Sequence, residues 1–242
     1  MLLTVFLLNL SILDKAQSQE FTWEFTQTIR DSLGQEKNEH ITYLISPQVT
    51  KIRYSNEIIY INYHKHILYR YNKADKVCLK FPLISNNKNK PTDTEEALKK
   101  RNISAISSLK VFSTTERKEI AQYDCSLKHV MYGADLAMFQ MVAPLVAHEF
   151  GQSFTESMVG YYVSDEVFGL HTLYKIAQKR SDVFNNNPLL RQIDIVGLLE
   201  ILNGFPVQIN QKLRDTDSVT TLLGNPEPNK DNTLFILPAE CR

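Results

Sequence analysis

The sequence has no excess of charge of either sign. Its 242 residues contain 27 Lys and Arg and 27 Asp and Glu, so the formal net charge is +0. A protein that binds nucleic acid through phosphate contacts needs a basic excess or a clustered basic stripe, and the sequence has neither. We therefore expect no nucleic-acid partner.

Long hydrophobic runs are missing beyond the first residues. The apolar run from Leu2 to Leu13 is too short to cross a bilayer as a helix, so we expect no stable membrane insertion. Small residues follow at Ala16 and Ser18, in the pattern that a signal peptidase recognises. Residues 1–18 are therefore predicted to be the cleavable signal peptide of a periplasmic or secreted protein. A buried N-terminal core segment is the alternative.

Cysteine is scarce, which limits the chemistry that the chain can support. The three cysteines form no CxxC pair and no cluster with histidine, so the sequence predicts no metal site, and we expect no cofactor. In an oxidising compartment three cysteines allow one disulfide and one remaining thiol. Cys78 and Cys125 are the predicted pair, since each lies on an expected strand, and Cys241 is left over. Three unpaired cysteines are the alternative.

Residues 40–83 carry the strongest structural pattern. Apolar or aromatic residues alternate with polar ones in short runs, for example at Ile41, Tyr43 and Ile45. Alternation with period two is typical of strands that have one buried and one solvated face. The runs are separated by short polar stretches that suit tight turns. Consecutive strands are therefore predicted to pair as an antiparallel meander.

The remaining segments mix strands and helices. Further strands are expected at residues 20–31, 108–114, 119–132, 158–164, 205–212, 218–223 and 232–238. Helical spacing is found at residues 134–150 with a break at Pro144, at 170–177 and at 189–202. Charged and polar residues predict a turn at 116–118 and a surface loop at 84–106. Residues 19–242 are thus predicted to form a single α+β domain, a curved antiparallel β-sheet or half-barrel covered by helices inserted between the later strands.

Many aromatic side chains lie on the expected strands and suggest a surface that binds a hydrophobic ligand. If the sheet curls, its concave face would carry these rings, which suit an acyl chain or another hydrophobic small molecule. The predicted lining of this cavity is Trp23, Phe25, Tyr43, Ile52, Tyr54, Tyr63, Tyr69, Phe81 and Phe139. The alternative is an ordinary core filled by the later helices, since protein interiors normally pack without voids.

No catalytic residue is predicted. His148 and Glu149 resemble the start of a zinc-protease helix, but the second histidine that such a helix needs is replaced by Gln152. His64 and His66 lie two residues apart in an expected turn, and no third metal ligand accompanies them. These groups are interpreted as polar residues of a helix end and a solvated turn.

Several segments together resemble a known family. They include a K-x-R strand at Lys51-Ile52-Arg53, a segment similar to I-A-G-Y-x-C at residues 120–125 in which Gln122 replaces the usual glycine, and a G-F-P-V turn at residues 204–207. The set resembles the bacterial envelope family named domain of unknown function 4412. Its members are similar at fold level to the lipoprotein carriers LolA and LolB. The resemblance implies a half-barrel of antiparallel strands, closed by helices around an apolar cavity, in a protein of the cell envelope.

The leading functional hypothesis is an exported, non-enzymatic carrier or binding protein for a lipid-like or other hydrophobic ligand in the cell envelope. The second is a secreted or periplasmic interaction module, an accessory subunit with a filled core that binds an envelope protein. The third is an envelope hydrolase that uses His148 or the segment Ser164-Asp165-Glu166. Because the same fold can serve different functions, the fold alone does not decide among them.

Overall fold

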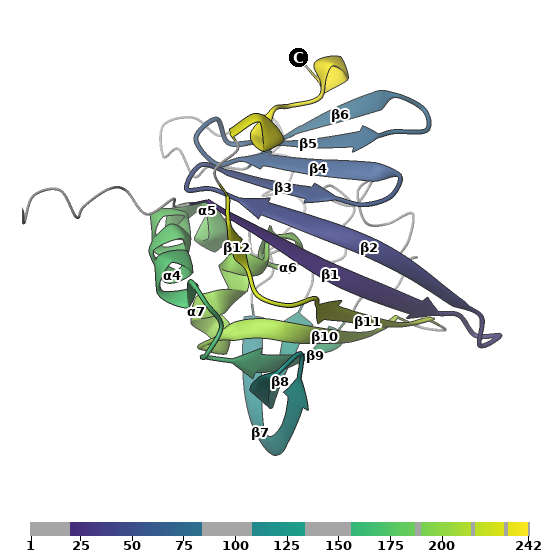
Figure 1. The fold of residues 1–242 in the computed structure, drawn as a ribbon, viewed down its shortest axis with the longest axis vertical. Coiled ribbons are helices and arrows are strands. Elements are labelled where there is room, and N and C mark those ends of the chain that lie inside the picture. The colour runs from purple at the N-terminus through teal and green to yellow at the C-terminus, as the bar shows by residue number, and fades with distance from the viewer. Residues whose placement is uncertain are drawn as a thin grey trace, which may run out of the picture.

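One large antiparallel sheet dominates the computed structural model, which describes residues 20–83, 108–133, 156–186, 190–213, 216–229 and 232–241. The strand order is β6-β5-β4-β3-β2-β1-β11-β10-β9-β8-β7, and β12 pairs with β1 beside β11 (Figure 1). Within the described residues the sheet is open, with β6 at one end and β7 at the other. The predicted antiparallel sheet is confirmed, whereas the half-barrel with a helical cover stays a prediction.

The first six strands form the meander that the alternating pattern predicts. Each strand pairs antiparallel with the next, from β1 through β6. Tight turns connect the strands from β2 to β6, because only three or four residues, most of them polar, separate consecutive strands. The strand bounds are β1 Phe21–Arg30, β2 Glu36–Ile45, β3 Val49–Arg53, β4 Glu57–Asn62, β5 Ile67–Asn72 and β6 Val77–Pro82.

The second half of the sheet differs from the prediction at one turn. The predicted charged turn at residues 116–118 is wrong, because these residues lie inside β7. The chain turns instead at Ala121 and Gln122, whose φ angles are 49° and 67°. Two residues with positive φ match the twist of a tight hairpin, but Ala-Gln is not a sequence that signals one. The remaining strands are β7 Ser108–Ile120, β8 Tyr123–Gly133, β9 Glu156–Ser164, β10 Phe205–Leu213, β11 Thr216–Leu222 and β12 Glu227–Pro228.

Short helices follow β9 in the chain and precede β10. The predicted helix at residues 170–177 is confirmed as α4, but the one at 189–202 is divided into three short pieces. Asp194 interrupts it, because its backbone is extended and its side chain accepts a hydrogen bond from the Val196 amide. The helices are α4 Leu170–Lys179, α5 Ser181–Asn186, α6 Leu190–Ile193, the 3₁₀ helix η1 Ile195–Leu198 and α7 Leu199–Leu202. None of the described helices is long and apolar enough to span a membrane.

The main core joins the first strands to the helical insert. Trp23 and Phe25 of β1 share one cluster of buried side chains with Leu173 of α4 and Leu199 of α7. The ring of Phe205, at the start of β10, lies 5.6 Å from the ring of Trp23 between centroids. Residues far apart in the sequence therefore close one core, and its burial supplies most of the driving force for folding.

The C-terminal residues correct two predictions. The expected final strand at residues 232–238 is wrong, because the chain forms the 3₁₀ helices η2 Asn232–Phe235 and η3 Ala239–Cys241. The predicted disulfide between Cys78 and Cys125 is wrong too. Cys78 bonds to Cys241, and Cys125 is a buried free thiol. The predicted signal peptide at 1–18, the loop at 84–106 and the helix at 134–150 lie outside the described residues.

Candidate functional site

Most of the aromatic residues predicted to line a cavity are packed against other side chains. Trp23, Phe25 and Ile52 are fully buried in the main core, and Tyr43 and Tyr54 pack against its border. In the core, the indole Nε1 of Trp23 has no hydrogen-bond partner among the described residues. A buried donor without a partner costs free energy, so this nitrogen marks a place where the core is imperfectly satisfied.

The other predicted lining residues are distributed over different places. Tyr63 is buried in a second cluster, and Phe81 packs against that cluster. Tyr69 lies on the face of the meander opposite the main core. It pairs there with Tyr60 and Lys80 in the register of β4, β5 and β6. Its ring centroid is 6.2 Å from that of Tyr60. The last predicted residue, Phe139, lies outside the described residues.

A buried ion pair connects the helical insert to the meander. Arg180, immediately after α4, places Nη1 2.7 Å from Oδ2 of Asp194. The hydroxyl of Thr50 in β3 accepts a bond from Arg180 Nη1 at 2.8 Å and donates one to Asp194 Oδ2 at 2.7 Å. Tyr63 also donates to Asp194 Oδ2, and its ring centroid lies 4.0 Å from the guanidinium carbon of Arg180.

The remaining donors of this ion pair are also occupied. Arg180 Nη2 donates to the backbone carbonyls of Ser46 and Val49 in the turn between β2 and β3. Burial and the neighbouring Asp194 carboxylate raise the pKa of Tyr63 well above its usual range, so this hydroxyl keeps the proton that it donates. Both Arg180 and Asp194 therefore form hydrogen bonds with other groups of the protein. This arrangement fixes the turn onto the helices, and the sequence alone did not indicate it.

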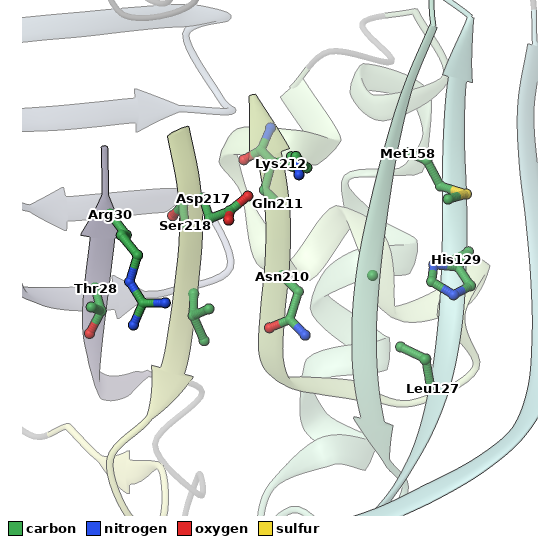
Figure 2. A pocket seen from close by; sticks show the side chains of 12 residues that line it. Thr28, Arg30, Leu127, His129, Met158, Asn210, Gln211, Lys212, Asp217 and Ser218 are labelled. Atoms are coloured by element: carbon green, nitrogen blue, oxygen red, sulfur yellow. The ribbon is translucent and has the colours of Figure 1, made fainter. Parts of the chain in front are cut away.

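A groove lies across five neighbouring strands of the sheet, from β1 through β11, β10 and β9 to β8. The strand register places one residue of each strand opposite the next in a single row: Thr28 of β1, Val219 of β11, Asn210 of β10, Gly160 of β9 and His129 of β8. Figure 2 shows Thr28, Asn210 and His129 on three of these strands. The groove has a volume of about 420 Å³, and these residues are part of its lining. Such a volume lies within the range of small-molecule sites.

Gly160 makes room for the groove at its centre. A Cβ atom at this position would come within 3.5 Å of Leu127 and 3.7 Å of both Asn210 and His129. The space between β8 and β10 is therefore open at Gly160, and a larger side chain at this position would occupy it. A glycine inside a strand often marks such a close approach, and this was the one signal in the sequence that could have located the groove.

The groove lies on the face of β9 opposite that of Val159 and Tyr161, and it borders the main core at Leu127. Val159 and Tyr161 form a buried cluster with Leu198 of η1 and Leu202 of α7. Because side chains alternate along a strand, Gly160 between them faces the other way.

The lining of the groove contains both apolar and polar side chains. Leu127, Met158 and Val219 contribute apolar surface, and Met158 and Val219 are exposed. His129 lies beside them, and its buried Nδ1 has no hydrogen-bond partner among the described residues. Phe112 of β7, opposite His129 in the register, is a further exposed apolar side chain. These side chains can therefore contact the hydrophobic part of a ligand.

Charged residues of both signs stand at one end of the groove. Arg30, Asp217 and Lys212 are consecutive in the row next to that of Gly160 (Figure 2). Arg30 Nε also donates to Glu36 at 3.0 Å, and this contact, together with its charge, raises the pKa of the guanidinium. The two positive and two negative groups balance one another. Electrostatic attraction therefore selects no strongly charged ligand.

Comparison with known proteins gives no family assignment. No protein-family model matches the sequence, and no curated protein matches it. The resemblance to domain of unknown function 4412 therefore stays a prediction.

Several solved structures show a similar course of the chain at low identity. A LolA superfamily protein from Nitrosomonas europaea matches with a TM-score of 0.37 and 8% identity, over 94% of this chain and 97% of that one. The lipoprotein LppX from Mycobacterium tuberculosis matches with a TM-score of 0.36 and 8% identity, over 91% and 93%. PNGF-II matches with a TM-score of 0.38 and 10% identity over 89% of this chain, which spans only 29% of the length of PNGF-II. At these scores none of the three carries an argument about function.

Proposed function

We propose that this protein is an exported, non-enzymatic binding protein or carrier for a hydrophobic, lipid-like ligand. The observation that supports the proposal is the groove around Gly160, with a volume of about 420 Å³ and apolar side chains at Leu127, Met158 and Val219. Burial of an acyl chain or a similar body there would contribute about 25 cal/mol per Å² of apolar surface. The periplasm or the secreted fraction is the proposed location.

The lining of the groove suits binding better than catalysis. Its titratable residues are His129, Arg30, Lys212 and Asp217, and the charges of Arg30 and Lys212 are compensated by Asp217 together with Glu36, the partner of Arg30. A general acid or base needs a partner that orients it, and the described residues give the Nδ1 atom of His129 no such partner.

The aromatic residues predicted from the sequence remain a proposal for a second binding surface. Trp23, Phe25 and Ile52 are closely packed, so a ligand that reached them would have to separate β1 to β3 from α4 and α7. The unpartnered Nε1 atom of Trp23 favours this alternative. A Tyr43→Ala variant distinguishes the two surfaces, because it enlarges the border of the core and leaves the groove unchanged.

Purified protein tests the proposal in two steps. Organic-solvent extraction followed by mass spectrometry should recover a co-purified hydrophobic molecule, and delipidated protein should take up a fluorescent long-chain fatty acid with a stoichiometry near one. Empty protein that binds neither fatty acid nor detergent would contradict the carrier proposal. Binding that is lost in Tyr43→Ala would assign the ligand to the aromatic core.

A second candidate function is an interaction module with a filled core. It is favoured by the complete burial of Trp23, Phe25 and Ile52 among neighbouring side chains. In that case the partner is an envelope protein, and the groove with its exposed neighbours Phe112 and Met158 belongs to the contact surface. Empty protein that co-purifies with one stoichiometric protein partner would support this function over a carrier.

A further inference from the structure

The C-terminal segment, residues 232–241, lies on the face of the meander opposite the main core. Its 3₁₀ helix η3 ends at Cys241, which is bonded to Cys78 of β6, the strand at one end of the sheet (Figure 1). The two cysteines are 163 residues apart in the sequence. The disulfide therefore connects residues 232–241 to β6, the strand at one end of the sheet.

Lys51 of β3 forms the main polar contact beneath this segment. Its Nζ donates to the backbone carbonyls of Leu234 and Ile236, each at 2.9 Å. The side chain is only 9% exposed, and burial lowers the pKa of the ammonium group. Both acceptors are neutral carbonyls, so the ammonium depends on the segment for its hydrogen bonds.

The surface around Lys51 is more buried than the outer face of a sheet normally is. Leu44, Lys51, Tyr60, Tyr69 and Lys80 form one row across β2 to β6. The first three are buried, whereas Lys80 at the end of the row is exposed. Removal of the C-terminal segment would take away the two carbonyl groups that accept hydrogen bonds from Lys51.

The segment itself gains little from burial. Each residue from 233 to 241 is exposed or only half-buried, and the side chain of Ile236 is half exposed. Besides the two bonds from Lys51, one further contact is the hydrogen bond between Tyr71 and the Glu240 carboxylate. Because no residue from 233 to 241 is fully buried, the segment opens at a smaller cost in free energy than the sheet does when nothing covalent holds it.

We propose that residues 232–241 are a redox-controlled clasp, closed over Lys51 by the Cys78–Cys241 disulfide and released when that disulfide is reduced. A dithiol reductant supplies two electrons and two protons, its own sulfurs form a disulfide, and Cys78 and Cys241 become thiols. Release exposes the ammonium group of Lys51. The clasp does not depend on the proposed ligand groove, which lies on other strands.

Hydrogen exchange with mass spectrometry tests the clasp on the whole protein. Amides of residues 232–241 should exchange about tenfold faster or more after treatment with dithiothreitol, and β3 and β4 should become less protected. Reoxidation should restore the slow exchange. The Cys125→Ser variant, which keeps the disulfide, should behave like the wild type.

Two variants separate release from unfolding. Cys78→Ser should show fast exchange of residues 232–241 without reductant, while β8, β9 and β10 stay protected. Lys51→Met should leave the oxidised protein closed and should speed exchange of the segment further in the reduced protein. Unchanged protection of residues 232–241 after complete reduction of the disulfide would overturn the proposal, as would loss of protection over the whole sheet.

Discussion

Arg180 and Asp194 form an ion pair whose atoms Nη1 and Oδ2 lie 2.7 Å apart, and at most 1% of either side chain is exposed. The pair joins the end of α4 to the residue that interrupts the following helical segment. Through Thr50 and the carbonyls of the β2–β3 turn it also fixes the helices to the meander. Its contribution is best measured by removal of one partner, because that leaves the other charge buried and alone.

Asp194→Asn should lower the free energy of unfolding by about 3 to 5 kcal/mol, since the buried guanidinium of Arg180 loses its counter-charge. Chemical denaturation followed by circular dichroism measures the change. Replacement of both residues by apolar ones of similar size should cost less than the single change. As a control, Asp124→Asn removes an exposed ion pair with Arg117 and should have little effect. A wild-type denaturation midpoint in Asp194→Asn would contradict the assigned role.

Gly160→Val should weaken binding of the fluorescent fatty acid by about tenfold or more, because the new side chain occupies the centre of the groove. The backbone tolerates the change, since a Cβ at this position makes only ordinary contacts. Fluorescence titration gives the dissociation constant. Thr220→Val, on the opposite face of the neighbouring strands, is the matched control and should bind as the wild type does. Equal affinity of all three proteins would exclude the groove as the binding site.

Gln122→Gly should raise the free energy of unfolding by about 1 kcal/mol, because Gln122 has a φ of 67° that glycine adopts without strain. This position is also the one at which the resembling family usually has glycine. Thermal unfolding detects the shift. Lys118→Gly, inside β7, should have the opposite effect, since glycine weakens a strand interior. A lower unfolding temperature for Gln122→Gly would show that the side chain makes a stabilising contact.

Cys125 should be unreactive toward thiol reagents at pH 8 until the protein unfolds. The side chain is buried, and burial raises the pKa of its thiol from 9.0 to about 11. The folded state therefore holds the proton more tightly than the unfolded state, and the free energy of unfolding should fall as the pH rises from about 9 toward 11. Titration with a chromogenic disulfide reagent and denaturation at several pH values measure both effects. In Cys125→Ala this pH dependence should be smaller, and rapid labelling of native protein at pH 8 would disprove the assignment.

The strands of the meander could be predicted from the sequence because their signal is local. Ile41, Tyr43 and the residues after them alternate with polar neighbours, and short polar turns make consecutive strands pair. The same reasoning located α4 and β10. It failed at residues 116–118, where charged side chains lie on the exposed strand β7, and at 232–238, where an apolar run forms a 3₁₀ helix instead of a strand.

The sequence by itself therefore determined the strands of the meander and how they pair with their neighbours, since both depend on residues close together in the chain. Only the tertiary structure decided that β1 pairs with β11, that Cys78 meets Cys241 and that Arg180 meets Asp194 and Thr50. It also decided that Thr28, Val219, Asn210, Gly160 and His129 line one groove. These residues are brought together by the register of strands distant in the sequence, and no local pattern of side chains specifies that register.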